Sequence, residues 1–186
     1  DSYDGKRGKP CRYRGYARTN GGRRRQFTLD VVSKRWRLRR RSVSGYLLIM
    51  ALARIVIVDD HALAREGLKA VLAGEGFEIV ETADGSDTVK RYSEAMIAQK
   101  PFDLVLIDLT IPLGMGGARA MELLRQTDPD VDAIVSSGNR SDPAMIQPSI
   151  HGFADVLPKP YDSRDLVRIV KQVLERRHQR LAASRA

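Results

Sequence analysis

Six polar residues of this sequence stand where runs of aliphatic residues end, and their chemical types together suggest phosphoryl chemistry. They are the acids Asp59, Asp60 and Asp108, the hydroxyl residues Ser136 and Ser137, and Lys159. A single aspartate in such a place is usually a helix cap. Acids, hydroxyls and a lysine at the ends of four separate runs are harder to explain by capping, so we treat them as one candidate site.

Three carboxylates brought together would repel one another, by about 4 kcal/mol per pair at roughly 4 Å in an effective dielectric constant near 20. A divalent cation would remove that repulsion, and hard oxygen ligands favour Mg²⁺, or Mn²⁺ in its place. A lysine can pair with a carboxylate or a phosphoryl oxygen, and a hydroxyl can hydrogen-bond the same oxygen. These groups therefore predict in-line transfer of a phosphoryl group onto a carboxylate.

The spacing of apolar residues predicts the elements that position these groups. The continuous apolar run at 54–58 predicts a strand buried on both faces, and short segments rich in aliphatic residues predict strands at 77–82, 103–107, 133–136 and 154–157. Apolar residues at helical spacing predict helices at 62–73, 85–98, 118–126, 143–150 and 164–180. Asp142 followed by Pro143 is the expected start of the fourth helix.

Five strands alternating with five helices predict an α/β fold. We expect a doubly wound five-stranded parallel sheet of the flavodoxin-like (βα)5 type, with strand order 2-1-3-4-5. Ligands of such sheets bind beyond the carboxyl ends of the strands. All six polar residues are predicted to lie at that edge.

The basic charge of the chain belongs to its first quarter. Residues 1–50 hold 15 Lys and Arg against three Asp and Glu, whereas residues 51–186 hold 17 against 20, within a net charge of +9. The basic segment has few aliphatic residues and predicts an irregular extension, apart from a possible short strand at 27–32. It is either a basic arm for nucleic acid or anionic lipid, or a solvated or non-native extension preceding a start at Met50.

Cysteine content and hydropathy limit the cellular compartment in which the protein is expected. The one cysteine, Cys11, excludes an internal disulfide framework and fits a reducing compartment. The apolar stretch 46–53 is too short to span a bilayer and leaves no room for a cleavage site before the strand at 54–58. We expect a cytoplasmic protein without a membrane segment.

Four motifs together resemble the receiver domain of two-component response regulators. They are VIVDDH (56–61), LVLIDLTIP (104–112), IVSSG (134–138) and LPKPY (157–161). The resemblance implies a receiver domain over 53–180 that acts as a phosphorylation switch, followed by a tail at 181–186. It implies that Asp108 accepts a phosphoryl group from the phosphohistidine of a histidine kinase or phosphotransfer protein.

The resemblance also implies roles for the other residues. Asp60 would bind the metal directly and Asp59 directly or through water, with Asp108 and the backbone carbonyl of Thr110 as further ligands. Ser137, 22 residues before Lys159, matches the switch hydroxyl better than Ser136 does. Lys159 and Pro160 match the family's usual cis peptide bond, which directs the lysine inward.

Two features depart from the family pattern. Val156 occupies the position where the family commonly has a mobile aromatic residue, which predicts a weaker or rerouted coupling. The loop PLGMGG (112–117) is one residue longer than usual and resembles the corresponding loop in receivers of hybrid sensor histidine kinases.

We expect no catalysis beyond phosphotransfer to the chain itself and autodephosphorylation. We expect no effector domain after residue 186. The signal would then pass to a downstream protein target through the face formed by the fourth helix, fifth strand and fifth helix. The same face could also support a homodimer.

Two other functions compete with this interpretation. The first is a phosphatase with an aspartyl nucleophile, but such enzymes place a second acid two residues after the nucleophile, where this chain has Thr110. The second is a nucleic-acid-binding regulator that uses residues 1–50. Turnover of phosphate esters and a steep salt dependence of binding, respectively, would identify them.

Overall fold

A computed structural model describes residues 11–18, 24–32, 35–38, 53–112 and 114–184. The chain divides into two units, residues 1–49 and 50–186. The boundary falls where the basic segment meets the first predicted parallel strand.

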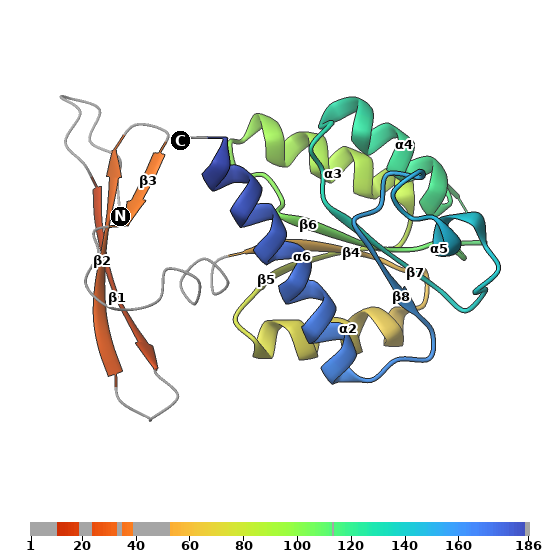
Figure 1. The fold of residues 1–186 in the computed structure, drawn as a ribbon, viewed down its shortest axis with the longest axis horizontal. Coiled ribbons are helices and arrows are strands. Elements are labelled where there is room, and N and C mark those ends of the chain that lie inside the picture. Colours follow the sequence, from red (N-terminus) through yellow and green to blue (C-terminus); the bar gives the residue numbers. More distant parts are fainter. Residues whose placement is uncertain (1–10, 19–23, 33–34, 39–52, 113, 185–186) are drawn as a thin grey trace. The chain divides into compact units, whose positions relative to one another are not determined.

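The first unit contains an antiparallel sheet with strand order β1-β2-β3 (Figure 1). Its strands are β1 (Cys11–Arg18), β2 (Arg24–Val32) and β3 (Arg35–Leu38). The sequence predicted an irregular segment with at most a strand at 27–32, so the structure departs from that expectation. Antiparallel strands satisfy their backbone groups with close neighbours in sequence. They therefore form here without the aliphatic runs that marked the later strands.

The second unit is an alternation of strands and helices. In chain order its elements are β4 (Arg54–Val58), α2 (Ala62–Gly74), β5 (Glu78–Thr82), α3 (Gly85–Ile97), β6 (Leu104–Asp108), α4 (Gly117–Thr127), β7 (Ala133–Ser137), α5 (Pro143–Ile146), β8 (Asp155–Pro158) and α6 (Ser163–Ala183). The strands are all parallel in the order β5-β4-β6-β7-β8. The predicted α/β fold and the strand order 2-1-3-4-5 are confirmed.

Helices cover both faces of this sheet, with α2 and α6 on one side and α3 and α4 on the other (Figure 1). Every residue of β6 and β7 is buried, as expected for central strands of a doubly wound sheet. The core under α3 and α4 is formed chiefly by Val56, Val58, Tyr92, Val105, Ile107, Met121, Leu124 and Val135. This rigid layer holds the carboxyl ends of the strands in place.

Two predicted helix boundaries were wrong. The helix expected at 143–150 ends at Ile146, because Pro148 lacks the N–H that would continue the helix and its ring crowds the preceding turn. Its start is as predicted, since Asp142 Oδ1 accepts a hydrogen bond from Ala144 N at 2.9 Å. Helix α6 continues to Ala183, three residues into the predicted tail. Among the described residues, no helix is both long and apolar enough to cross a membrane.

Candidate functional site

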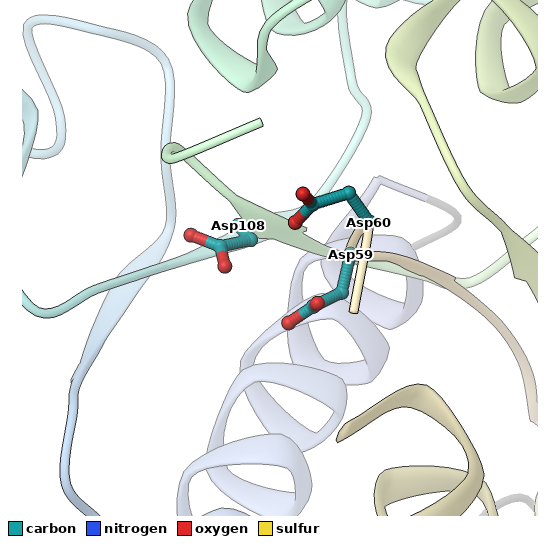
Figure 2. Close-up of side chains that lie close together, drawn as sticks. All are labelled: Asp59, Asp60 and Asp108. Carbon is teal, nitrogen blue, oxygen red and sulfur yellow. The ribbon is translucent and has the colours of Figure 1, made fainter. Parts of the chain in front are cut away.

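Three acids converge beyond the ends of β4 and β6 (Figure 2). Asp59 and Asp60 follow β4 directly, and Asp108 is the last residue of β6. One carboxylate oxygen of each lies within 4.8 Å of those of the other two. The parallel pairing of β4 with β6 brings these chain positions together, as the sequence predicted.

Asp59 is buried, with 2% of its surface exposed, and both of its carboxylate oxygens accept hydrogen bonds. Its Oδ1 atom accepts a hydrogen bond from His61 N at 2.8 Å, and its Oδ2 atom accepts one from Lys159 Nζ at 3.1 Å. Asp60, by contrast, is exposed, and within the described residues its carboxylate accepts no hydrogen bond. Asp60 is therefore the acid of the cluster whose oxygens are open to a ligand.

Asp108 lies between a backbone donor and an ammonium group. Its Oδ1 atom accepts a hydrogen bond from Thr110 N at 2.9 Å, and its Oδ2 atom accepts one from Lys159 Nζ at 2.6 Å. The residue is 6% exposed, so its carboxylate is desolvated but can be reached from the edge of the sheet. The two donors fix the orientation of this buried carboxylate.

Lys159 provides the positive charge of the site. Burial lowers the pKa of its ammonium group, but hydrogen bonds and charges from Asp108 and Asp59 raise the pKa by more, so the net shift is upward. The Lys159–Pro160 peptide bond is cis, and Lys159 N donates to Ser137 O at 2.9 Å. The lysine is therefore attached to β7 as well as to the acids.

The two serines at the end of β7 differ in their partners. Both are buried, Ser136 at 3% and Ser137 at 1% exposure. Ser137 Oγ accepts a hydrogen bond from Asn139 N at 3.1 Å. Ser136 stands beside Asp108 in the β6–β7 register, but its hydroxyl makes no aligned hydrogen bond within the described part of the chain. Ser137, which the sequence favoured as the switch hydroxyl, is thus held in a turn.

Tyr161 is a neighbour of the site that the sequence reasoning did not single out. Burial raises the pKa of its phenol, while the nearby Ser136 hydroxyl and the Lys159 charge act in the opposite direction. The two hydroxyls are thus close without forming an aligned bond. The position of Tyr161, two residues after Lys159, was the feature of the sequence that could have identified it as a neighbour of the site. Val156 is half-buried and packs against the hydrophobic core.

Arg65 is a second neighbour of the site that the sequence did not lead us to expect. Its Nη1 atom donates to the backbone carbonyl of Asp59 at 2.5 Å, and the residue is half-buried near the start of α2. A cation close to a helix N-terminus opposes the helix dipole unless it has a partner elsewhere. That unfavourable placement was the signal in the sequence.

The donor set fits a hard divalent cation. The three acids offer carboxylate oxygens to one point, and the exposure of Asp60 leaves room for the water ligands that Mg²⁺ retains. No hydrogen bond to the Thr110 carbonyl forms within the described residues, so that oxygen is also free to bind. The three acids that the sequence proposed as ligands can therefore act together.

Comparison with known proteins agrees with this geometry. A family model described as the response regulator receiver domain matches residues 55–171. The chain is 34% identical to the response regulator GacA of Pseudomonas aeruginosa over 122 residues, which are 64% of this chain and 54% of that protein. It is 31% identical to the chemotaxis protein CheY of Thermotoga maritima over 121 residues, 64% of this chain and 96% of that one. The chain thus spans about half of GacA and nearly all of CheY.

Solved structures show the same fold. A CheY-like receiver domain protein of Methanospirillum hungatei superposes with a TM-score of 0.62 at 26% identity, over 69% of this chain and 98% of that one. A complex of CheX and CheY with BeF3 and Mg²⁺ from Borrelia burgdorferi matches with a TM-score of 0.59 at 26% identity, over 65% of this chain and 88% of that chain.

Proposed function

Because the chain belongs to the receiver domain family of two-component response regulators, we propose that it is a phosphorylation switch whose acceptor is Asp108. One observation carries the proposal. Lys159 Nζ lies 2.6 Å from Asp108 Oδ2 while the carboxylates of Asp59 and Asp60 converge on the same point. The site thus combines a nucleophile, a cation and additional metal ligands at one sheet edge.

The reaction transfers a phosphoryl group from the phosphohistidine of a histidine kinase or phosphotransfer protein. The phosphorus–nitrogen bond breaks as a carboxylate oxygen of Asp108 forms the new phosphorus–oxygen bond, and the imidazole leaves with the bonding electron pair. The Lys159 ammonium, already at Asp108, neutralises charge on the phosphoryl oxygens as they arrive. The acids raise its pKa by more than burial lowers it, so the ammonium group stays charged at neutral pH.

Asp60, Asp59, Asp108 and the Thr110 carbonyl would hold Mg²⁺ or Mn²⁺. When bound, the metal supplies the charge that lets phosphoryl oxygens approach three carboxylates. The Borrelia CheY complex, which contains BeF3 and Mg²⁺, supports such a site on the same fold. Asp59 and Asp108 each already accept a hydrogen bond at both carboxylate oxygens, so Asp60 is the better candidate for a direct ligand.

The charge added by phosphorylation, about −1.5 to −2, would shift an equilibrium between two conformations. Output would pass to a downstream protein through the face formed by α5, β8 and α6, which could also support a homodimer. In this proposal the protein acts in the cytoplasm. Its catalysis is limited to its own phosphorylation and dephosphorylation.

The test is phosphorylation by acetyl phosphate or phosphoramidate in the presence of Mg²⁺. Wild-type protein should gain one phosphoryl group by intact-protein mass spectrometry, and Asp108→Asn should gain none. Asp130→Asn, at an exposed site, is the matched control and should label like wild type. Labelling that persists in Asp108→Asn would overturn the site assignment.

The charge of residues 1–50 supports one additional function, binding to nucleic acid. Binding of this kind should weaken steeply with salt, because counterions are released on association. Deletion of residues 1–49 should remove it without changing phosphorylation of Asp108.

A further inference from the structure

The peptide bond between Asp59 and Asp60 is held from outside the acidic cluster by Arg65. The Arg65 guanidinium donates from Nη1 to Asp59 O at 2.5 Å, across the first turn of α2. The backbone of Arg65 is fixed in turn, since its N–H donates to His61 O at 3.1 Å. This guanidinium therefore connects α2 to the loop that carries two of the three acids.

Holding the Asp59 carbonyl has a direct effect on Asp60. The carbonyl oxygen of one residue and the Cα atom of the next belong to the same planar unit. Fixing the orientation of the Asp59 carbonyl therefore fixes the direction in which the chain enters Asp60. The Asp60 side chain has no hydrogen bond of its own among the described residues, so its direction depends on this backbone.

The helix position of Arg65 is unfavourable, although the nearby acids attract its charge. A positive charge close to a helix N-terminus opposes the helix dipole, and half-burial removes part of its hydration. Its bond to Asp59 O is the one polar contact the side chain makes within the described part of the chain. A charge-assisted bond to a carbonyl offsets some of this cost, and it fixes the orientation of the peptide that leads into Asp60.

We propose that Arg65 is a positioning residue of the metal site, which fixes the Asp59–Asp60 peptide so that the Asp60 carboxylate stays directed at Asp108. The proposal rests on the metal site of the proposed function and deepens it. Groups that orient metal ligands from outside the first coordination shell typically change metal affinity by about 10- to 100-fold.

The test measures Mn²⁺ affinity of the full chain by electron paramagnetic resonance, without any phosphodonor. Arg65→Met should bind Mn²⁺ about tenfold more weakly than wild type, and Arg65→Lys should lie between them. Lys69→Met is the matched control, because it removes one positive charge from the same helix one turn further on, where Lys69 pairs with Glu81.

Charge alone predicts the opposite result, which makes the test decisive. Removing a cation near an acidic site should tighten binding of a second cation, in Arg65→Met as in Lys69→Met. Weaker binding in Arg65→Met together with unchanged or tighter binding in Lys69→Met supports positioning. Equal affinity in these two variants overturns it.

Asp60→Asn separates this proposal from the proposed function. If Asp60→Asn binds Mn²⁺ as wild type does, the metal site itself is wrongly assigned. If Asp60→Asn loses affinity and Arg65→Met does not, only the role of Arg65 fails. Should Arg65→Met be unfolded by circular dichroism, Arg65→Lys decides, because it keeps the charge and loses the forked donor.

Discussion

Gly117 lies directly against the backbone of Asp108. A methyl group added at Gly117 would stand 2.4 Å from the Asp108 carbonyl oxygen and 2.6 Å from Ile107 Cγ2. Since Gly117 is the first residue of α4, the start of this helix abuts the end of the strand that presents the acceptor. One of the glycines in the lengthened loop thus permits a close approach rather than an unusual turn.

Gly117→Ala should therefore destabilise the protein by about 2 kcal/mol, because the added carbon meets backbone that cannot move without shifting Asp108. Phosphorylation by acetyl phosphate should slow as well. Gly116→Ala is the control, since a methyl group there meets nothing within 4 Å. Urea unfolding and labelling rates measure both effects, and equal losses in the two variants would contradict this explanation.

Lys159→Met should make the metal-free protein less stable, by about 2 kcal/mol after allowance for solvent screening. The change leaves the buried carboxylates of Asp59 and Asp108 without their shared cation. Mg²⁺ should then stabilise the variant more than it stabilises wild type, because the metal takes over that charge. Urea unfolding with and without Mg²⁺ checks this.

The matched control for that experiment is Lys171→Met, which breaks a more exposed pair with Glu75. Its unfolding free energy should change by less than about 1 kcal/mol. Its response to Mg²⁺ should equal that of wild type. If Mg²⁺ stabilised the Lys159 and wild-type proteins equally, Lys159 would not be the cation that balances the acids.

The parallel sheet and the meeting of the acids could be predicted because both follow from local patterns. The strands β4 and β6 are short aliphatic runs, and Asp59, Asp60 and Asp108 stand where these two runs end. Parallel pairing then brings the strand ends together whatever the loops do. The partners of each acid were less predictable, because hydrogen bonds such as that from His61 N depend on loop geometry.

Other features depend on contacts between distant parts of the chain. Asp132 and Arg177 are 45 residues apart, and no local pattern marks them as a pair. The three strands of the first unit are short on aliphatic runs, so composition alone predicted an irregular segment. Pro148 is a different case, since its effect on the helix that ends at Ile146 was visible in the sequence and was overlooked.

Asp132→Asn should cost about 3 kcal/mol of unfolding free energy, because it leaves the nearly buried Arg177 guanidinium with Asp103, at 3.9 Å, as its remaining carboxylate partner. Asp132 is 4% exposed and accepts hydrogen bonds from Arg177 at 3.0 Å and from Arg180 at 2.6 Å. Glu122→Gln, in an exposed pair with Arg119, should change stability by less than about 1 kcal/mol. Urea unfolding of both variants checks the contrast, and a loss at Asp132 no larger than at Glu122 would show that the buried pair contributes little.

Tyr92→Phe should lower stability by about 2 kcal/mol near neutral pH, because it removes a hydrogen bond to a charged group. Tyr92 is 1% exposed, and its hydroxyl donates to Asp128 Oδ2 at 2.7 Å. Burial, followed by the bond to Asp128, raises the pKa of the phenol far above its usual value.

The difference between wild type and Tyr92→Phe should shrink in alkaline solution. A raised folded-state pKa contributes stability below the unfolded-state pKa of about 10, and that contribution declines as pH rises above it, because the unfolded phenol ionises while the folded one keeps its proton. Urea unfolding of both proteins from about pH 7 to about pH 11 measures the change, with absorbance of tyrosinate as a direct record of ionisation. A difference that stayed constant across this range would mean that the Tyr92 phenol ionises as readily in the folded protein as in the unfolded chain.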